Sequence, residues 1–157
     1  MLSRYVQSII NEHGVPPKVQ NIVRYCLLKE NGKVFEDWGK EVIETMVTYH
    51  MVKKTIITKY DDKGDIIGVL MWYVCDNNDG WEFVKNWEED KEDGDTIFLA
   101  FLFSDGIEVV KEMVLDIIRQ EPDILTKKII GIRQRNGTPT RVEYTLKLFN
   151  KILKSHG

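Results

Sequence analysis

A chain of 157 residues, 43% of them hydrophobic and 30% charged, is expected to fold as one soluble domain with a sizeable core. No apolar run approaches the ~20 residues of a membrane span, and residues 1–5 lack the basic and apolar pattern of a signal peptide. The net charge of -3 and two cysteines inside apolar segments are typical of a cytoplasmic protein with buried, reduced thiols.

The first third of the chain predicts three amphipathic helices, because apolar residues recur there at helical spacing. Gly14 and Asn31 follow the first two of these apolar patterns and are expected to end the corresponding helices. The helices are expected over residues 2–12, from Pro17 to about residue 30, and over residues 36–52. Residues 1–52 would therefore be a helical N-terminal part, and residues 53–157 the sheet core, of a single domain.

Five later segments are rich in β-branched and aromatic residues and predict strands. The first two would form a hairpin around residues 61–65, and Gly68 predicts a bulge or a close backbone approach. Residues 81–95 are acidic and predict a short helix or a flap laid on the sheet by Trp81 and Trp87. The strands are expected over residues 55–60, 66–75, 97–103, 128–132 and 142–148.

The stretch around residues 97–133 predicts the centre of the fold. Seven consecutive apolar residues, 97–103, suit a strand covered on both faces, and an amphipathic helix follows over Ile107–Gln120. The next strand, 128–132, should then lie parallel to the first, through a right-handed crossover. We expect an α+β fold with a mixed, mostly antiparallel sheet, a central β-α-β unit and helices on its faces.

The last strand has a competing interpretation. Val142, Tyr144, Leu146 and Leu148 alternate with polar residues, as in a half-buried antiparallel strand. A helix whose apolar side carries Val142, Leu146, Phe149 and Leu153 also fits the pattern. Both interpretations stay open from the sequence.

The corner between the central strand and its helix is Ser104-Asp105-Gly106, and it has two interpretations. The first N–H groups of a helix lack partners and its dipole is positive there, so the corner could bind an anion. Asp105, with Glu108 three residues later, instead matches a capping box, whose carboxylate would occupy those N–H groups.

The order of elements resembles that of the GNAT acyltransferase superfamily, over roughly residues 55–148. The phosphate loop of that superfamily, Arg/Gln-x-x-Gly-x-Gly/Ala, falls on residues 101–106, where Gly106 is the shared position. The resemblance implies a GNAT-like N-acyltransferase that uses acetyl-CoA or acyl-CoA as co-substrate and modifies the amine of a protein or small molecule. It implies donor-binding residues at the corner, namely Leu102, Phe103, Ser104, Asp105, Gly106 and Ile107.

A narrower likeness is to the toxin-activating lysine acyltransferases, GNAT-like proteins that use acyl carrier protein. Trp87 and Gly94-Asp95 resemble their lead into the central strand, and Glu121-Pro122-Asp123 and Ile132-Arg133 resemble the segments after that strand. Their catalytic aspartate would fall near Ala100 in this chain.

Two residues are candidates for acid–base catalysis. His50, at the end of the third predicted helix, is the candidate general base among the histidines, whereas His13 fits a helix-end cation. Tyr144 is the candidate general acid, or else a core tyrosine with a bonded hydroxyl. The cysteines and histidines show no paired ligand spacing, so no metal site is expected.

The alternative function is a non-catalytic, GNAT-shaped binding or assembly protein. The lysine, isoleucine and asparagine content of the chain suits an AT-rich genome, such as that of a phage. As a phage protein it would be a virion or host-interaction component, located in the host cytoplasm or in the virion. Charge is uneven, with a net -7 over residues 76–95 and +7 over residues 127–157. The basic residues alternate along strands without clustered aromatics, so nucleic acid is not the expected partner.

Overall fold

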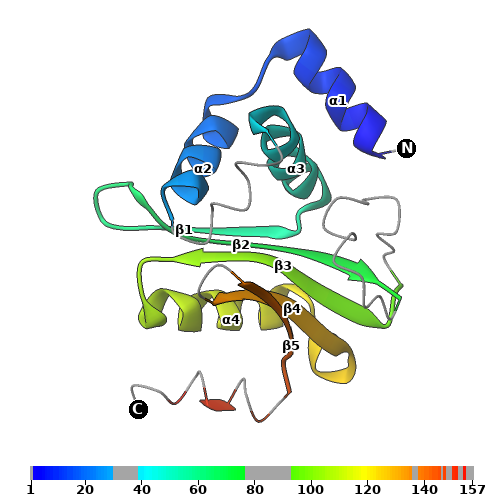
Figure 1. The fold of residues 1–157 in the computed structure, drawn as a ribbon, viewed down its shortest axis with the longest axis vertical. Coiled ribbons are helices and arrows are strands. Elements are labelled where there is room, and N and C mark those ends of the chain that lie inside the picture. The colour runs from blue at the N-terminus through cyan, green and yellow to red at the C-terminus, as the bar shows by residue number, and fades with distance from the viewer. Residues whose placement is uncertain are drawn as a thin grey trace. The chain divides into compact units, whose positions relative to one another are not determined.

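The computed structural model of the protein describes residues 2–29, 39–76, 93–135 and 138–145, together with 147, 150, 151 and 154. Across these residues it is an α+β protein with four α-helices and one five-stranded mixed sheet (Figure 1). The chain forms two compact units, Met1–Ile56 and Ile57–Gly157, and each is described by itself.

The first unit contains three helices, as the apolar spacing predicts. Helices α1 (Leu2–His13) and α2 (Pro17–Leu28) each contact α3 (Lys40–Lys53). Pro17 stands in the first turn of α2, where the missing N–H costs no hydrogen bond. Residues 36–38, where the third helix was expected to start, lie outside the described residues.

Helix α3 is the centre of the first unit, because residues 43–50 are all buried. Its two buried threonines satisfy their hydroxyls on the helix itself. Oγ1 of Thr45 donates to the carbonyl of Glu41, and Oγ1 of Thr48 donates to the carbonyl of Glu44, each over 2.8 Å. Lys54 then takes the left-handed conformation, with φ of 62°, and ends the helix.

The second unit is built on the sheet, whose strand order is β1-β2-β3-β4-β5. The strands are β1 (Ile56–Tyr60), β2 (Ile66–Cys75), β3 (Thr96–Ser104), β4 (Lys128–Arg135) and β5 (Thr138–Glu143). β3 pairs antiparallel with β2 and parallel with β4, and β5 pairs antiparallel with β4. The predicted β-α-β unit is thus confirmed: β3 and β4 are parallel neighbours joined through α4 (Ile107–Gln120) and a short 3₁₀ turn (Ile124–Thr126).

Helix α4 packs along one face of the sheet, and the core of the second unit lies between them (Figure 1). The face of the helix that points to the sheet carries Met113, Val114 and Ile117, in the spacing of an amphipathic helix. The strand residues that meet it alternate along β2, β3 and β4: Leu70, Trp72, Val74, Ile97, Leu99 and Ile129.

Gly68 lies where α4 approaches β2, and the close approach there is made by side chains of the helix, not by the backbone that the sequence led us to expect. A Cβ placed on Gly68 would lie 2.5 Å from Cγ1 of Val109 and 3.1 Å from the thioether of Met113. We expect Gly68→Ala to destabilise the second unit by roughly 1–3 kcal/mol, because the helix must move or its side chains must leave their rotamers. Urea unfolding followed by circular dichroism would measure the loss, and an unchanged midpoint would contradict it.

The predicted strand 142–148 is correct only in its first part. β5 ends at Glu143, and Lys147, Asn150, Lys151 and Lys154 are helical. The alternation from Val142 to Leu148 therefore spans two different elements, and the helical interpretation holds for the described residues after Thr145. Residues 77–92 of the acidic stretch lie outside the described residues.

Strand β1 stands at one edge of the sheet and is tied to α4 by its lysine. Nζ of Lys59 lies 2.7 Å from Oδ2 of Asp116 and 3.9 Å from Oε2 of Glu112. The Lys59 and Asp116 side chains are each about a quarter exposed, at 26% and 27%, so the ammonium is held against the helix. This ion pair links β1 to α4 on the face of the sheet that the helix covers.

Candidate functional site

The candidate site lies where the two parallel strands of the sheet separate. Strand β3 contains a bulge: Trp72 of β2 stands opposite Leu99, whereas the adjacent Met71 stands opposite Phe101. Ala100 is therefore the extra residue, and a bulge of this kind bends its strand and increases the local twist. Ala100 is also where the resemblance to the toxin-activating enzymes would place an aspartate, and alanine has no acid–base group.

The parallel ladder between β3 and β4 ends at this bulge. Its described pairs run from Thr96 with Lys128 to Leu99 with Gly131. Both strands continue, to Ser104 and Arg135, but over these described residues they are not paired with each other. The carboxyl ends of β3 and β4 thus separate just after Leu99 and Gly131, at the same end of the sheet as the start of α4.

Tyr144 contacts Gly131, the last residue of β4 in the parallel ladder. Its main-chain N–H donates to the carbonyl of Ile129 over 2.7 Å, which extends the β4–β5 pairing by one residue. Its ring lies over Gly131: a Cβ built there would be 2.8 Å from Cε2 of Tyr144, and 3.5 Å from the phenolic oxygen. The sequence predicted an inward-pointing tyrosine, but Gly131 was not among the predicted site residues.

The corner before α4 is capped differently from the prediction. The N-cap residue is Gly106, in an extended conformation, and as a glycine it has no side chain with which to cap the helix. The N–H of Asp105 donates to the carbonyl of Ile67 over 2.9 Å, so Asp105 still belongs to the β2–β3 pairing and stands before the N-cap. The expected capping box of Asp105 and Glu108 is therefore wrong.

The predicted donor-binding residues differ in exposure. Leu102 packs against the core beneath α4, and Phe103 is buried and stacked on Phe101. Ser104 is half-buried, while Asp105, Gly106 and Ile107 are exposed. A ligand at the corner could therefore reach Asp105, Gly106 and Ile107 and the exposed part of Ser104.

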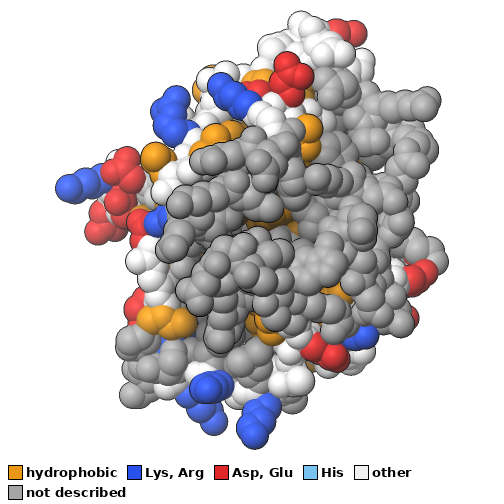
Figure 2. Space-filling model, viewed as in Figure 1, with side chains coloured by type: hydrophobic (Ala, Val, Ile, Leu, Met, Phe, Trp, Pro, Cys, Tyr) orange, Lys and Arg blue, Asp and Glu red, His pale blue; other side chains and the backbone are white. Residues whose placement is uncertain are grey.

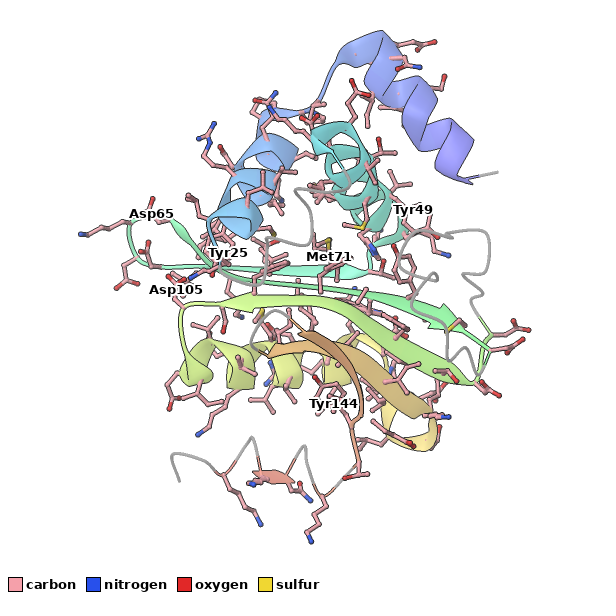
Figure 3. The ribbon with its side chains drawn as sticks, viewed as in Figure 1. Tyr25, Tyr49, Asp65, Met71, Asp105 and Tyr144 are labelled. Atoms are coloured by element: carbon pink, nitrogen blue, oxygen red, sulfur yellow. The ribbon has the colours of Figure 1, made fainter. Side chains whose placement is uncertain are left out.

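The surroundings of the corner are acidic. Asp65, in the turn between β1 and β2, and Asp105 lie at the same end of the sheet, and both are exposed (Figure 3). Figure 2 shows several acidic side chains and a basic one at its left edge, where Figure 1 places that turn. Asp61, in the turn, accepts main-chain N–H groups of Lys63 and Asp65, each over 2.9 Å. The ammonium of Lys111, in the first turns of α4, is 3.8 Å from Glu108.

Comparison of the chain with models of known protein families, and with the sequences of curated proteins, gives no match. Within the described residues no helix is long and apolar enough to cross a membrane. In the same residues, no three His, Cys, Asp or Glu side chains are grouped so as to hold a metal ion.

His50, the candidate base, belongs to the first unit, whereas Tyr144 and the corner belong to the second. Its side chain is fully buried, and Nδ1 lies 2.8 Å from Oγ1 of Thr55. Burial lowers its pKa from 6.5 to about 3; a hydrogen bond with the main chain of Thr55 opposes this fall, and the charge of Lys53 adds to it. Such an imidazole is neutral at pH 7 but a weak base, and its contacts are those of a structural residue. Its catalytic role stays a prediction.

The two thiols are poorly suited to nucleophilic catalysis. Both Cys26 and Cys75 are buried and reduced. Burial raises the pKa of Cys26 to about 12, although a hydrogen bond to the thiol opposes the rise, so the reactive thiolate is scarcely formed at neutral pH. Cys26 is therefore a poor candidate for a nucleophile that would form a covalent acyl-cysteine intermediate.

Proposed function

We propose that the protein is an N-acyltransferase that takes its acyl group from acetyl-CoA or a longer acyl-CoA. The observation that supports this best is the separation of β3 and β4 just beyond Leu99 and Gly131. A thioester inserted between the two strands would meet the main-chain N–H groups of the strands that line the separation. Such donors stabilise the negative charge that develops on a carbonyl oxygen during acyl transfer.

The chemistry proposed at this point needs few side chains. The neutral amine of the acceptor attacks the thioester carbon, the C–N bond forms, and the C–S bond breaks to release the thiolate of coenzyme A. Tyr144, over Gly131, is placed to give its phenolic proton to that thiolate, and the proton lost by the amine returns to solvent or to the tyrosinate. Positioning of the two reactants supplies much of the rate, so the absence of a nucleophilic triad is compatible with this reaction.

The start of α4 is the proposed site of the donor's pyrophosphate. The N-cap residue Gly106 has no capping side chain of its own, and a Cβ built on it would meet no atom within 4 Å. A helix N-terminus of this kind attracts anions. The negative charge of the Asp105 carboxylate repels the pyrophosphate. This charge is therefore the feature of the corner that most directly limits the affinity for the donor.

The test is a calorimetric titration with acetyl-CoA of the protein and of Asp105→Asn. We expect micromolar binding, tightened roughly threefold to tenfold in the variant, since removing one nearby like charge is worth about 1 kcal/mol at the surface. Asp123→Asn, an exposed aspartate before the 3₁₀ turn of the same unit, is the control and should leave the affinity unchanged. No heat with any of the proteins up to millimolar ligand would contradict the proposal.

A second candidate is a GNAT-shaped protein without catalysis, which binds or assembles with another macromolecule. The acidic turn and corner favour it, because they would repel the phosphates of coenzyme A. It predicts that acetyl-CoA fails to bind even to Asp105→Asn. Binding by that variant alone would instead indicate a donor site whose natural donor carries less negative charge than coenzyme A.

A further inference from the structure

We propose that the C-terminal segment of the chain, residues 146–154, docks as a helix on one flank of α4 in the same molecule. That flank carries Ile107, Leu115 and Ile118, and we call it the apolar flank of α4. The inference goes beyond the proposed function and does not depend on it, because it concerns only α4 and the segment that follows β5.

The first argument is the apolar surface that α4 presents outside its core-facing side. Positions 107, 115 and 118 are separated by eight and three residues, so their side chains share one flank of the helix. Ile107 is 37% exposed and Leu115 is 41% exposed, while Ile118 is partly exposed. The apolar flank can therefore accept another apolar surface without any change in the packing of α4 on the sheet.

The second argument is the direction of this flank. Helix α4 contacts β2 and β3, and its other flank binds the edge strand β1, through the ion pair of Asp116 with Lys59. The apolar flank therefore faces the other side of the sheet, where β4 and β5 lie. Tyr144, the first residue after β5, packs against the core cluster beneath α4. The chain thus leaves β5 on the face of the sheet that α4 covers, beside the apolar flank.

The third argument is the two-sided pattern of the C-terminal segment. Its described residues are helical and exposed, and their spacing of three, one and three places them on one side of a helix: Lys147, Asn150, Lys151 and Lys154. In the sequence, the positions between them are all apolar: Leu148, Phe149, Ile152 and Leu153. A helix with this pattern has a basic side in water and an apolar side that needs a partner.

The fourth argument is that such a helix is too short to be stable alone. Isolated helices below about 12–15 residues are marginal in water. Like charges four residues apart, as at Lys147 and Lys151, weaken a helix further. Nine residues rise about 13 Å as a helix, and the 14 residues of α4 rise about 21 Å, so the segment can lie along more than half of α4.

The test is amide hydrogen exchange of residues 146–154, measured by mass spectrometry on the full chain at two protein concentrations. Leu115→Asp places a charge on the apolar flank, and Phe149→Asp places one on the apolar side of the segment. Each has a matched control that adds the same charge elsewhere. Tyr60→Asp changes an exposed residue, 46% accessible, at the opposite edge of the sheet, and Asn150→Asp changes the exposed side of the segment.

We expect slow exchange of the segment in the unmodified protein, equal at both concentrations. Leu115→Asp and Phe149→Asp should each speed it by about tenfold or more, because docking would bury an unpaired carboxylate in an apolar contact. Tyr60→Asp and Asn150→Asp should exchange like the unmodified protein. Fast exchange in the unmodified protein, or slow exchange that survives Leu115→Asp, would overturn the proposal. Protection that rises with protein concentration would overturn it as well, because the segment would then dock on a second copy.

Discussion

Between pH 7 and pH 4.5 the folded state is expected to lose about 3 kcal/mol of stability through His50 alone. The pKa of His50 is lowered from 6.5 to about 3 in the folded chain, chiefly because its imidazole is fully buried. Below pH 6.5 the unfolded chain therefore binds a proton that the folded chain does not. Stability is fully present above pH 6.5 and falls progressively as the pH drops towards 3.

The measurement is chemical unfolding at a series of pH values, with His50→Asn and His13→Gln as variants. His50→Asn should be less stable at pH 7, since it disturbs the contact with Thr55, but its stability should change far less between pH 7 and 4.5. His13, whose side chain is 73% exposed at the end of α1, is the control and should leave the pH dependence as it is. Parallel pH profiles for the unmodified protein and His50→Asn would show that His50 titrates normally.

Replacing Trp72 with alanine is expected to destabilise the second unit by about 3–5 kcal/mol, the range for large-to-small changes at buried aromatic positions. Trp72 has no exposed surface, and it packs between β2 and α4 in the main core. Its Nε1 donates to Oε1 of Glu121, at the end of α4, over 3.1 Å. The change would therefore leave a cavity under the helix and remove a bond that ties the helix end to the sheet.

Urea unfolding followed by circular dichroism would measure this loss, with two graded variants beside it. Trp72→Phe should cost clearly less, because most of the ring volume stays. Glu121→Ala should cost roughly 1–3 kcal/mol, because it leaves the buried indole N–H without its acceptor. If Glu121→Ala and the unmodified protein unfold at the same urea concentration, the bond contributes nothing and the packing of Trp72 accounts for the whole effect.

The predicted elements agree with the structure where turn residues mark both ends. The helix Ile107–Gln120 and strand Ile66–Cys75 begin and end at the predicted residues, because turn residues flank both of them, and the helix also has a single helical spacing throughout. After Glu143 the helical interpretation is correct and the strand interpretation is wrong for the described residues. The sequence leaves both open, because Val142 to Leu148 satisfies the strand and helix periods at once and no turn residue separates the two elements.

The candidate site could be predicted only in outline. Seven consecutive apolar residues identify β3 as buried, but they carry no alternation, so nothing in them reveals that Ala100 is a bulge. Asp105 is a better N-cap residue than Gly106 by intrinsic preference, yet its N–H is held by Ile67 on a neighbouring strand. The contact between Gly131 and Tyr144 depends on the path of β5, which local sequence does not encode.

The ion pair between Lys59 and Asp116 affects whether molecules of this protein associate through the edge of the sheet. β1 ends the sheet on one side, and an edge strand can recruit a strand from another molecule through its exposed main-chain groups. A charged side chain directed inward from such a strand opposes this, because a sheet continued past β1 would have to cover the ammonium group and its carboxylate. Lys59→Val should therefore promote intermolecular β-sheet and fibrous aggregation at this edge, even where it leaves the fold of the single chain unchanged.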